Sequence, residues 1–143
     1  MKLGRMDIAI ALLMSVIVMS CEDIGEPADN LSGRYTFTGY DLNGTPVIHG
    51  TILLRRDDGT ISGEKNLVSE PFACESGTGL VEGEASGASL IRVFLSPAPC
   101  LVYIEGSITG ETIKGNRFGL PDRAPVMVPE KLGTFQAVRI ERE

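Results

Sequence analysis

Side chains that could carry out acid–base or nucleophilic chemistry are few in this chain, and their spacing matches no catalytic motif. His49 is the only histidine, and no serine or cysteine stands at a recognisable motif spacing from it. Acidic residues in apparent turns, such as Asp57, Asp58 and Glu111, serve backbone geometry. Four more lie in β-rich segments and are expected to face solvent, with a position inside a barrel lumen as the alternative: Glu64, Glu82, Glu84 and Glu105. The sequence therefore predicts a protein that is not an enzyme and implies neither a metal nor a cofactor.

The remaining reactive groups are three cysteines, of which the first closes an N-terminal segment with three parts. Lys2 and Arg5 are basic, residues 8–19 are uncharged and apolar, and the small Ser20 precedes Cys21. This order is typical of a secretory signal peptide, and the apolar run is too short to span a bilayer, which needs about 20 residues. The ending Val18-Met19-Ser20-Cys21 resembles the lipobox of bacterial lipoproteins, in which cleavage leaves the cysteine first and lipid is attached to it. The alternative is an ordinary signal peptide with Cys21 near its end by chance.

This resemblance implies three parts of the chain: residues 1–20 as a signal peptide, 21–30 as an acidic flexible tether and 31–143 as one domain. Removing residues 1–20 takes away two basic residues and one acidic residue, which changes the net charge from −6 to −7. An acidic surface argues against nucleic acid and against electrostatic binding to anionic lipid. Membrane contact is then expected through lipid on Cys21, which predicts a lipid-anchored protein of the bacterial cell envelope, in the outer membrane with its domain on the periplasmic or surface face.

Cys74 and Cys100 remain as an even pair in an oxidising compartment, which predicts a disulfide. Such a bond would close a loop of about 25 residues and stabilise the domain by roughly 3 kcal/mol through the unfolded state. Two free thiols and a metal site are the alternatives, and the second has only one histidine available to complete it.

From Leu31 onward, glycine or proline interrupts every stretch before a helix could form, and short β-rich runs alternate with turn residues. The sequence therefore predicts an all-β fold of about eight strands. The expected strands are Gly33–Tyr40, Val47–Arg56, Thr60–Leu67, Gly79–Glu84, Ser89–Leu95, Leu101–Ile108, Thr112–Phe118 and Gly133–Arg142.

Alternation of apolar and polar residues predicts one buried and one exposed face for most of these strands. Tyr35 and Phe37 are expected on one face, with Arg34, Thr36 and Thr38 on the other. The same pattern predicts three more inward-facing sets, namely Ile91, Val93 and Leu95, then Val102 and Ile104, then Val138 and Ile140. The second strand carries apolar residues on both faces, so its orientation stays open.

Connection lengths alternate along the chain. Tight turns are expected after the second, fourth and sixth strands, and longer connections after the third, fifth and seventh. In an up-and-down antiparallel barrel such an alternation gathers the long loops at one end, and it places Cys74 and Cys100 there together. Glycines inside several strands fit the bulges and sharp bends that a small barrel needs. A barrel is therefore the predicted architecture, with a β-sandwich as the alternative.

Leu31-Ser-Gly-Arg-Tyr35 and the turn at Asp58-Gly-Thr-Ile-Ser-Gly63 resemble the opening strand and second hairpin of lipocalin-like and avidin-like calycin barrels. The chain has no tryptophan, whereas those families carry one in the opening motif or around their ligand. The resemblance implies a barrel that binds a small apolar ligand at its loop-rich end, with Phe72, Phe118 and Met127 as candidate rim residues. The alternative is a module that recognises another envelope protein, as an assembly partner or an inhibitor-type lipoprotein, through the same loops.

Overall fold

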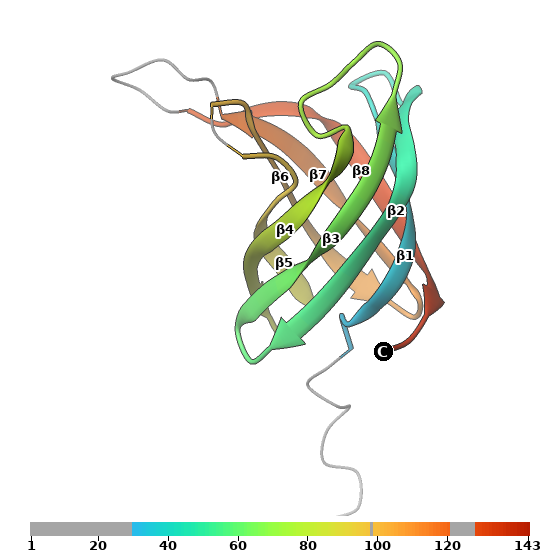
Figure 1. Ribbon diagram of the computed structural model, residues 1–143, viewed down its shortest axis with the longest axis vertical. Helices are drawn as coiled ribbons and strands as arrows, with labels where there is room; N and C mark the ends of the chain where they lie inside the picture. Colours follow the sequence, from blue (N-terminus) through green and yellow to red (C-terminus); the bar gives the residue numbers. More distant parts are fainter. Residues whose placement is uncertain (1–29, 98, 121–127) are drawn as a thin grey trace, which may run out of the picture.

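The chain forms a closed barrel of eight antiparallel strands (Figure 1). The computed structural model describes residues 30–97, 99–120 and 128–143. Its strands are β1 (Gly33–Tyr40), β2 (Pro46–Asp57), β3 (Thr60–Ser69), β4 (Gly77–Ser86), β5 (Ser89–Phe94), β6 (Leu101–Thr109), β7 (Thr112–Leu120) and β8 (Glu130–Glu141). Each strand pairs with the next, and β8 pairs with β1. The predicted all-β class and the predicted up-and-down barrel are confirmed, and the sandwich alternative is excluded.

Connection length distinguishes the two ends of the barrel (Figure 1). Two-residue turns follow β2, β4 and β6, and each contains a residue with positive φ: Asp58 (56°), Gly87 (58°) and Gly110 (63°). Such angles are typical of tight hairpin turns. Longer connections join β1 to β2 (residues 41–45), β3 to β4 (residues 70–76) and β5 to β6 at the opposite end, where β7 stops and β8 starts. We call the end with the two-residue turns the tight-turn end and the opposite end the loop-rich end. Among the described residues, none belongs to a helix long and apolar enough to cross a membrane.

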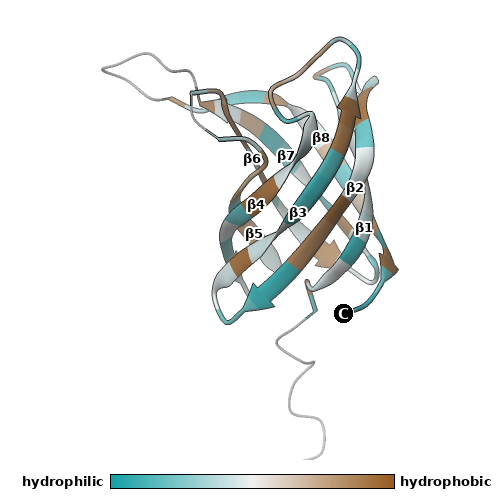
Figure 2. Ribbon diagram, viewed as in Figure 1, coloured by the Kyte–Doolittle hydropathy of each residue, from teal (hydrophilic) through white to brown (hydrophobic). Residues whose placement is uncertain are grey.

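Side chains that point inward fill the barrel. Tyr35 and Phe37 alternate with exposed or half-exposed residues along β1, as predicted. Phe37 stacks on Phe135 of β8 with 5.5 Å between the ring centroids, which joins the two strands that close the barrel. The buried cluster includes residues from every strand, among them Leu54, Ile61, Val81, Val93, Ile104 and Ile113. Figure 2 shows the corresponding alternation of hydrophobic and hydrophilic residues along the strands. Eight strands enclose a lumen just wide enough for side chains, and here apolar side chains occupy it.

Glycine allows neighbouring strands to approach where the barrel bends. A Cβ atom on Gly63 would lie 1.7 Å from the carbonyl oxygen of Leu53 on β2. A Cβ atom on Gly115 would lie 1.9 Å from the carbonyl oxygen of Glu105 on β6. No side chain fits at either position, because real Cβ contacts are longer than 3 Å. The prediction that glycines mark the bends of a small barrel therefore has a direct structural cause.

The predicted face of β8 is wrong. Alternation predicts Val138 and Ile140 inside the barrel, but Ile140 is 57% exposed and Arg139 is only 8% exposed. Arg139 turns inward at the tight-turn end, where its guanidinium lies 5.4 Å from the centroid of the Tyr35 ring and donates a hydrogen bond to the carbonyl oxygen of Asn30. Phe135 and Ala137, on the same face, contribute to the core. A cation–π contact, a backbone acceptor and an ion pair with Glu111 at 3.3 Å thus compensate an arginine in a position that the apolar pattern assigns to an isoleucine.

The prediction for β5 is correct for Val93 and wrong for Ile91. Pairing with β4 and β6 shifts register beside Arg92, which has a positive φ of 46°. This bulge puts an extra residue into the strand and breaks the alternation. Val93 is therefore buried, and Ile91 is 39% exposed.

Two residues on the outer wall are buried by their neighbours. Leu53, on the outer face of β2, is covered between Arg34 and Glu64, with which it pairs across the strands. Tyr103, on the outer face of β6, lies between the rings of Phe94 and Phe118. Alternation along β2 or β6 does not predict the burial of these two residues, because side chains of adjacent strands cover them.

Candidate functional site

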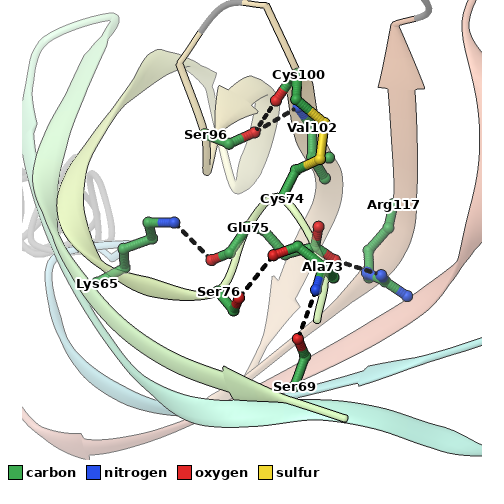
Figure 3. The surroundings of a disulfide bond; sticks show 10 residues. All are labelled: Lys65, Ser69, Ala73, Cys74, Glu75, Ser76, Ser96, Cys100, Val102 and Arg117. Carbon is green, nitrogen blue, oxygen red and sulfur yellow. Dashed lines mark hydrogen bonds and ion pairs between the residues drawn. A yellow bond between two sulfur atoms is a disulfide. The ribbon is translucent and has the colours of Figure 1, made fainter. Parts of the chain in front are cut away.

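The loop-rich end is closed by residues 70–76, which we call the cap loop. Cys74 in this loop forms a disulfide with Cys100 in the β5–β6 connection, with a Cα–Cα distance of 6.0 Å (Figure 3). The predicted disulfide is thus present, and its Cα separation is ordinary for such a bond. It connects two loops that emerge from the same end of the barrel, as the alternation of connection lengths predicted.

Short hydrogen bonds fix the loops on both sides of the disulfide (Figure 3). In the cap loop, the N–H of Ala73 donates to Ser69 Oγ at 2.8 Å, and Ser76 Oγ donates to the carbonyl oxygen of Ala73 at 2.6 Å. In the β5–β6 connection, Ser96 Oγ donates a hydrogen bond to the carbonyl oxygen of Cys100 at 2.6 Å and accepts one from the N–H of Val102 at 2.9 Å. Serine side chains thus satisfy backbone groups that no strand pairs with, and the loops are held in one conformation.

Glu75 points from the cap loop into the mouth of the barrel and is only 1% exposed. Its Oε1 accepts a hydrogen bond from Arg117 Nη2 at 2.6 Å, and its carbonyl oxygen accepts one from Lys65 Nζ at 2.5 Å (Figure 3). Arg117 also donates from Nη1 to the carbonyl oxygen of Tyr40 at 2.7 Å. Glu75 therefore connects a lysine of β3 to an arginine of β7 across the mouth.

These buried charges are only partly compensated. Burial lowers the pKa of Lys65, and the nearby Glu75 carboxylate opposes that shift. Arg117 Nε is buried and has no hydrogen-bond partner among the described residues. Among the described residues, Glu75 provides the one carboxylate within 4.0 Å of an Arg117 nitrogen, and no carboxylate lies within that distance of Lys65 Nζ. The mouth thus holds two cationic groups and one carboxylate away from water.

A recess of about 430 Å³ lies beside the disulfide at the same end. The Glu75–Arg117 pair lines one part of it. Most of the other lining residues are apolar, including Val47, Leu101, Val102, Leu120 and Leu132. Its size falls within the range of pockets for small organic ligands.

Apolar side chains project into solvent around the mouth. Phe72, in the cap loop, is 85% exposed, and Leu42, in the β1–β2 loop, is 70% exposed. Asp41 Oδ1 holds the second loop by accepting hydrogen bonds from the N–H groups of Asn43 and Thr45, both at 2.9 Å. Val68 and Val128 are also more than half exposed at this end. We call Leu42, Val68, Phe72 and Val128 the apolar tips.

The predicted site residues fall in different places. Phe72 lies at the rim, whereas Phe118 stacks on Tyr103 outside the barrel at 5.2 Å and is not among the residues that line the recess. Met127 and Cys21 lie outside the described residues, so the proposed ligand contact of the first and the lipidation of the second stay predictions.

Sequence reasoning did not identify the buried charges at the mouth. The sequence did contain a signal for two of them. Lys65 lies an even number of residues from Ile61 and Leu67, which face inward, and Arg117 lies an even number of residues from the inward-facing Ile113. Glu75 gave no such signal, because it lies in a loop without periodicity.

No group of histidine, cysteine and acidic side chains in the described ranges could hold a metal ion. Comparison of the chain with protein-family models, with curated proteins and with solved structures found no match.

Proposed function

We propose that this chain is a lipid-anchored cell-envelope protein that recognises another protein through its loop-rich end. The observation that carries this proposal is the group of apolar tips, of which Leu42 and Phe72 lie on loops that hydrogen bonds and a disulfide hold in place. Single exposed apolar residues are common on any protein surface. Four around one mouth, two of them on braced loops, are instead typical of a contact surface, where aromatic and aliphatic anchors supply most of the binding energy.

The packed lumen supports recognition by the loops rather than binding inside the barrel. Core side chains fill the interior, and the cap loop covers the mouth. A ligand in the lumen would have to displace both. A partner protein would meet loops that already have their bound conformation, which reduces the entropy lost on association.

The proposed lipid on Cys21 gives this surface an orientation. β1 starts at the tight-turn end, where Asn30 accepts a hydrogen bond from Arg139. A tether from Cys21 to Asn30 would therefore attach the barrel to the membrane by its tight-turn end and direct the apolar tips away from the bilayer.

The recess of about 430 Å³ favours a second candidate function, the binding of a small apolar ligand beside the disulfide. The two candidates predict different residues. Protein recognition depends on Phe72 and Leu42, whereas ligand binding depends on recess residues such as Leu120 and Leu132.

Site-specific photo-crosslinking in the native host tests the proposal. A photoreactive amino acid at position 72 should give one discrete protein adduct, and the additional substitution Leu42→Ser should reduce its yield by about tenfold or more. The matched control places the same photoreactive residue at position 140, where an exposed isoleucine lies at the opposite end. Equal adducts at positions 72 and 140 would refute recognition through the loop-rich end. Native mass spectrometry of the purified protein tests the second candidate, which requires a retained small molecule that Leu120→Arg releases.

A further inference from the structure

The cap loop closes the barrel with charges where apolar side chains would have sufficed. Lys65, Glu75 and Arg117 are each less than 10% exposed. Removing charges from water costs several kcal/mol for each ion, and replacing a buried ion pair by apolar residues is often neutral or stabilising. The stability of the barrel therefore does not account for this choice of residues.

The two cations retain unused hydrogen-bonding capacity. Among the described residues, the ammonium group of Lys65 has one acceptor for its three donors, the carbonyl oxygen of Glu75. Arg117 Nε has none. The cations belong to strands β3 and β7, whereas Glu75, which meets Arg117 with its carboxylate and Lys65 with its carbonyl oxygen, belongs to a loop. The strands thus provide a fixed receptor, and the loop provides the group that occupies it.

We propose that Lys65 and Arg117 form a carboxylate-binding site at the barrel mouth, which Glu75 occupies as an internal ligand while the Cys74–Cys100 disulfide is intact. Guanidinium binds carboxylate through paired N–H donors, and an ammonium group supplies a second positive charge. The ligand is a carboxylate on a small acid or on an acidic side chain of a partner. The carboxylate binds at the mouth and not deeper in the lumen, because core side chains fill the barrel below. This inference does not depend on the apolar tips.

Reduction of the disulfide opens the site to an external carboxylate. A thiolate of a dithiol reductant attacks one sulfur, forms a mixed disulfide and is released as an intramolecular disulfide, while Cys74 and Cys100 each gain a proton and become thiols. The cap loop is then covalently attached only through Ser69 and Gly77, and Lys65 and Arg117 hold it by noncovalent contacts with Glu75. Gly77, at one end of the loop, has a φ of 92° and nothing within 4 Å of a would-be Cβ atom, so no neighbouring group packs on that side of it. Loss of the cross-link lowers the effective concentration of Glu75 at the two cations, and an external carboxylate can compete.

The test compares the full chain, purified in detergent, in its oxidised and dithiol-reduced forms. Sodium acetate is titrated against sodium chloride at equal ionic strength, and the Nε–Hε NMR resonance of Arg117 is recorded. A saturable shift with acetate alone is expected, with an apparent affinity at least about tenfold higher in the reduced form. Lys65→Met should weaken acetate binding in the reduced form by about tenfold, while Lys114→Met, on the outer wall of β7, should leave it unchanged.

A second experiment titrates a short peptide with a central glutamate, and the same peptide with glutamine in its place is the control. Binding of the peptide but not acetate identifies an acidic side chain as the ligand, and binding of acetate alone identifies a small acid. Equal responses to acetate and chloride would overturn the proposal. So would failure of both probes in the reduced chain and in Glu75→Gln, a variant that removes the internal ligand without reduction. Crosslinking from position 72 reports separately on recognition by the apolar tips.

Discussion

The disulfide between the cap loop and the β5–β6 connection yields a prediction whose magnitude follows from its place in the chain. Cys74 and Cys100 are separated by 26 residues. The loss of loop-closure entropy in the denatured chain is about 2.1 + 1.5R ln n cal/mol/K, which for this loop corresponds to about 3.5 kcal/mol at 25 °C. The double variant Cys74→Ser/Cys100→Ser should lose that much free energy of unfolding, and its Tm should fall by about 15 °C.

Urea unfolding of the full chain in detergent, followed by circular dichroism, measures this loss, and the reduced wild-type protein should give the same value as the double variant. A second measurement separates the covalent constraint from the ion pair beneath it. Glu75→Gln should cost about 3 kcal/mol in the oxidised background, because it leaves Arg117 buried without its carboxylate. It should cost less in the double variant, where the cap loop can rearrange. A loss below about 1 kcal/mol on removing the disulfide would refute the reasoning, since the denatured chain would then gain little freedom.

Three further predictions concern other parts of the molecule. Burial raises the pKa of the Tyr35 phenol above its ordinary value of 10.0 despite the nearby guanidinium of Arg139, so the unfolded chain loses this proton at lower pH than the folded one. Stability should therefore fall as pH rises above about 10, and the fall should be smaller in Tyr35→Phe, as urea titrations at pH 9 and pH 11 can measure. Gly63→Ala should cost about 3 kcal/mol, because its Cβ atom would collide with a β2 carbonyl oxygen, whereas Gly59→Ala, with no contact closer than 3.7 Å, should cost less than about 1 kcal/mol in the same assay. Cys21→Ala should move the protein from the membrane fraction to the soluble fraction on cell fractionation, and continued anchoring would refute lipidation.

Much of the barrel was predictable because its signals are local. Glycine and aspartate set the tight turns through their backbone preferences, and alternation along β1 assigns Tyr35 and Phe37 to the interior. The pairing of Cys74 with Cys100 was predictable from the even number of cysteines left after Cys21, and the alternation of connection lengths separately places both at one end of the barrel.

Burial was predicted wrongly or missed where it depends on contacts between residues far apart in the sequence or on the conformation of a loop. Ile140 is more apolar than Arg139, yet the Arg139 side chain points inward. At the tight-turn end it forms a cation–π contact with the ring of Tyr35 and donates a hydrogen bond to the carbonyl oxygen of Asn30. Leu53 is buried by side chains of two other strands, so its own strand gives no indication of its burial. Glu75 is buried through the conformation of an irregular loop, which periodicity cannot predict.

Both ends of the described domain lie together, because the first residues of β1 pair with the last residues of β8, as Arg34 does with Glu141. A circular permutant therefore needs only a short linker, from residue 143 to residue 30, and the chain is reopened in the β6–β7 turn at Gly110. All eight strand pairings would be retained, and the loops at the far end would keep their sequence. Such a permutant could be displayed on a carrier from a new attachment point with its loop-rich end unchanged, which would separate the role of the proposed anchor from that of the barrel.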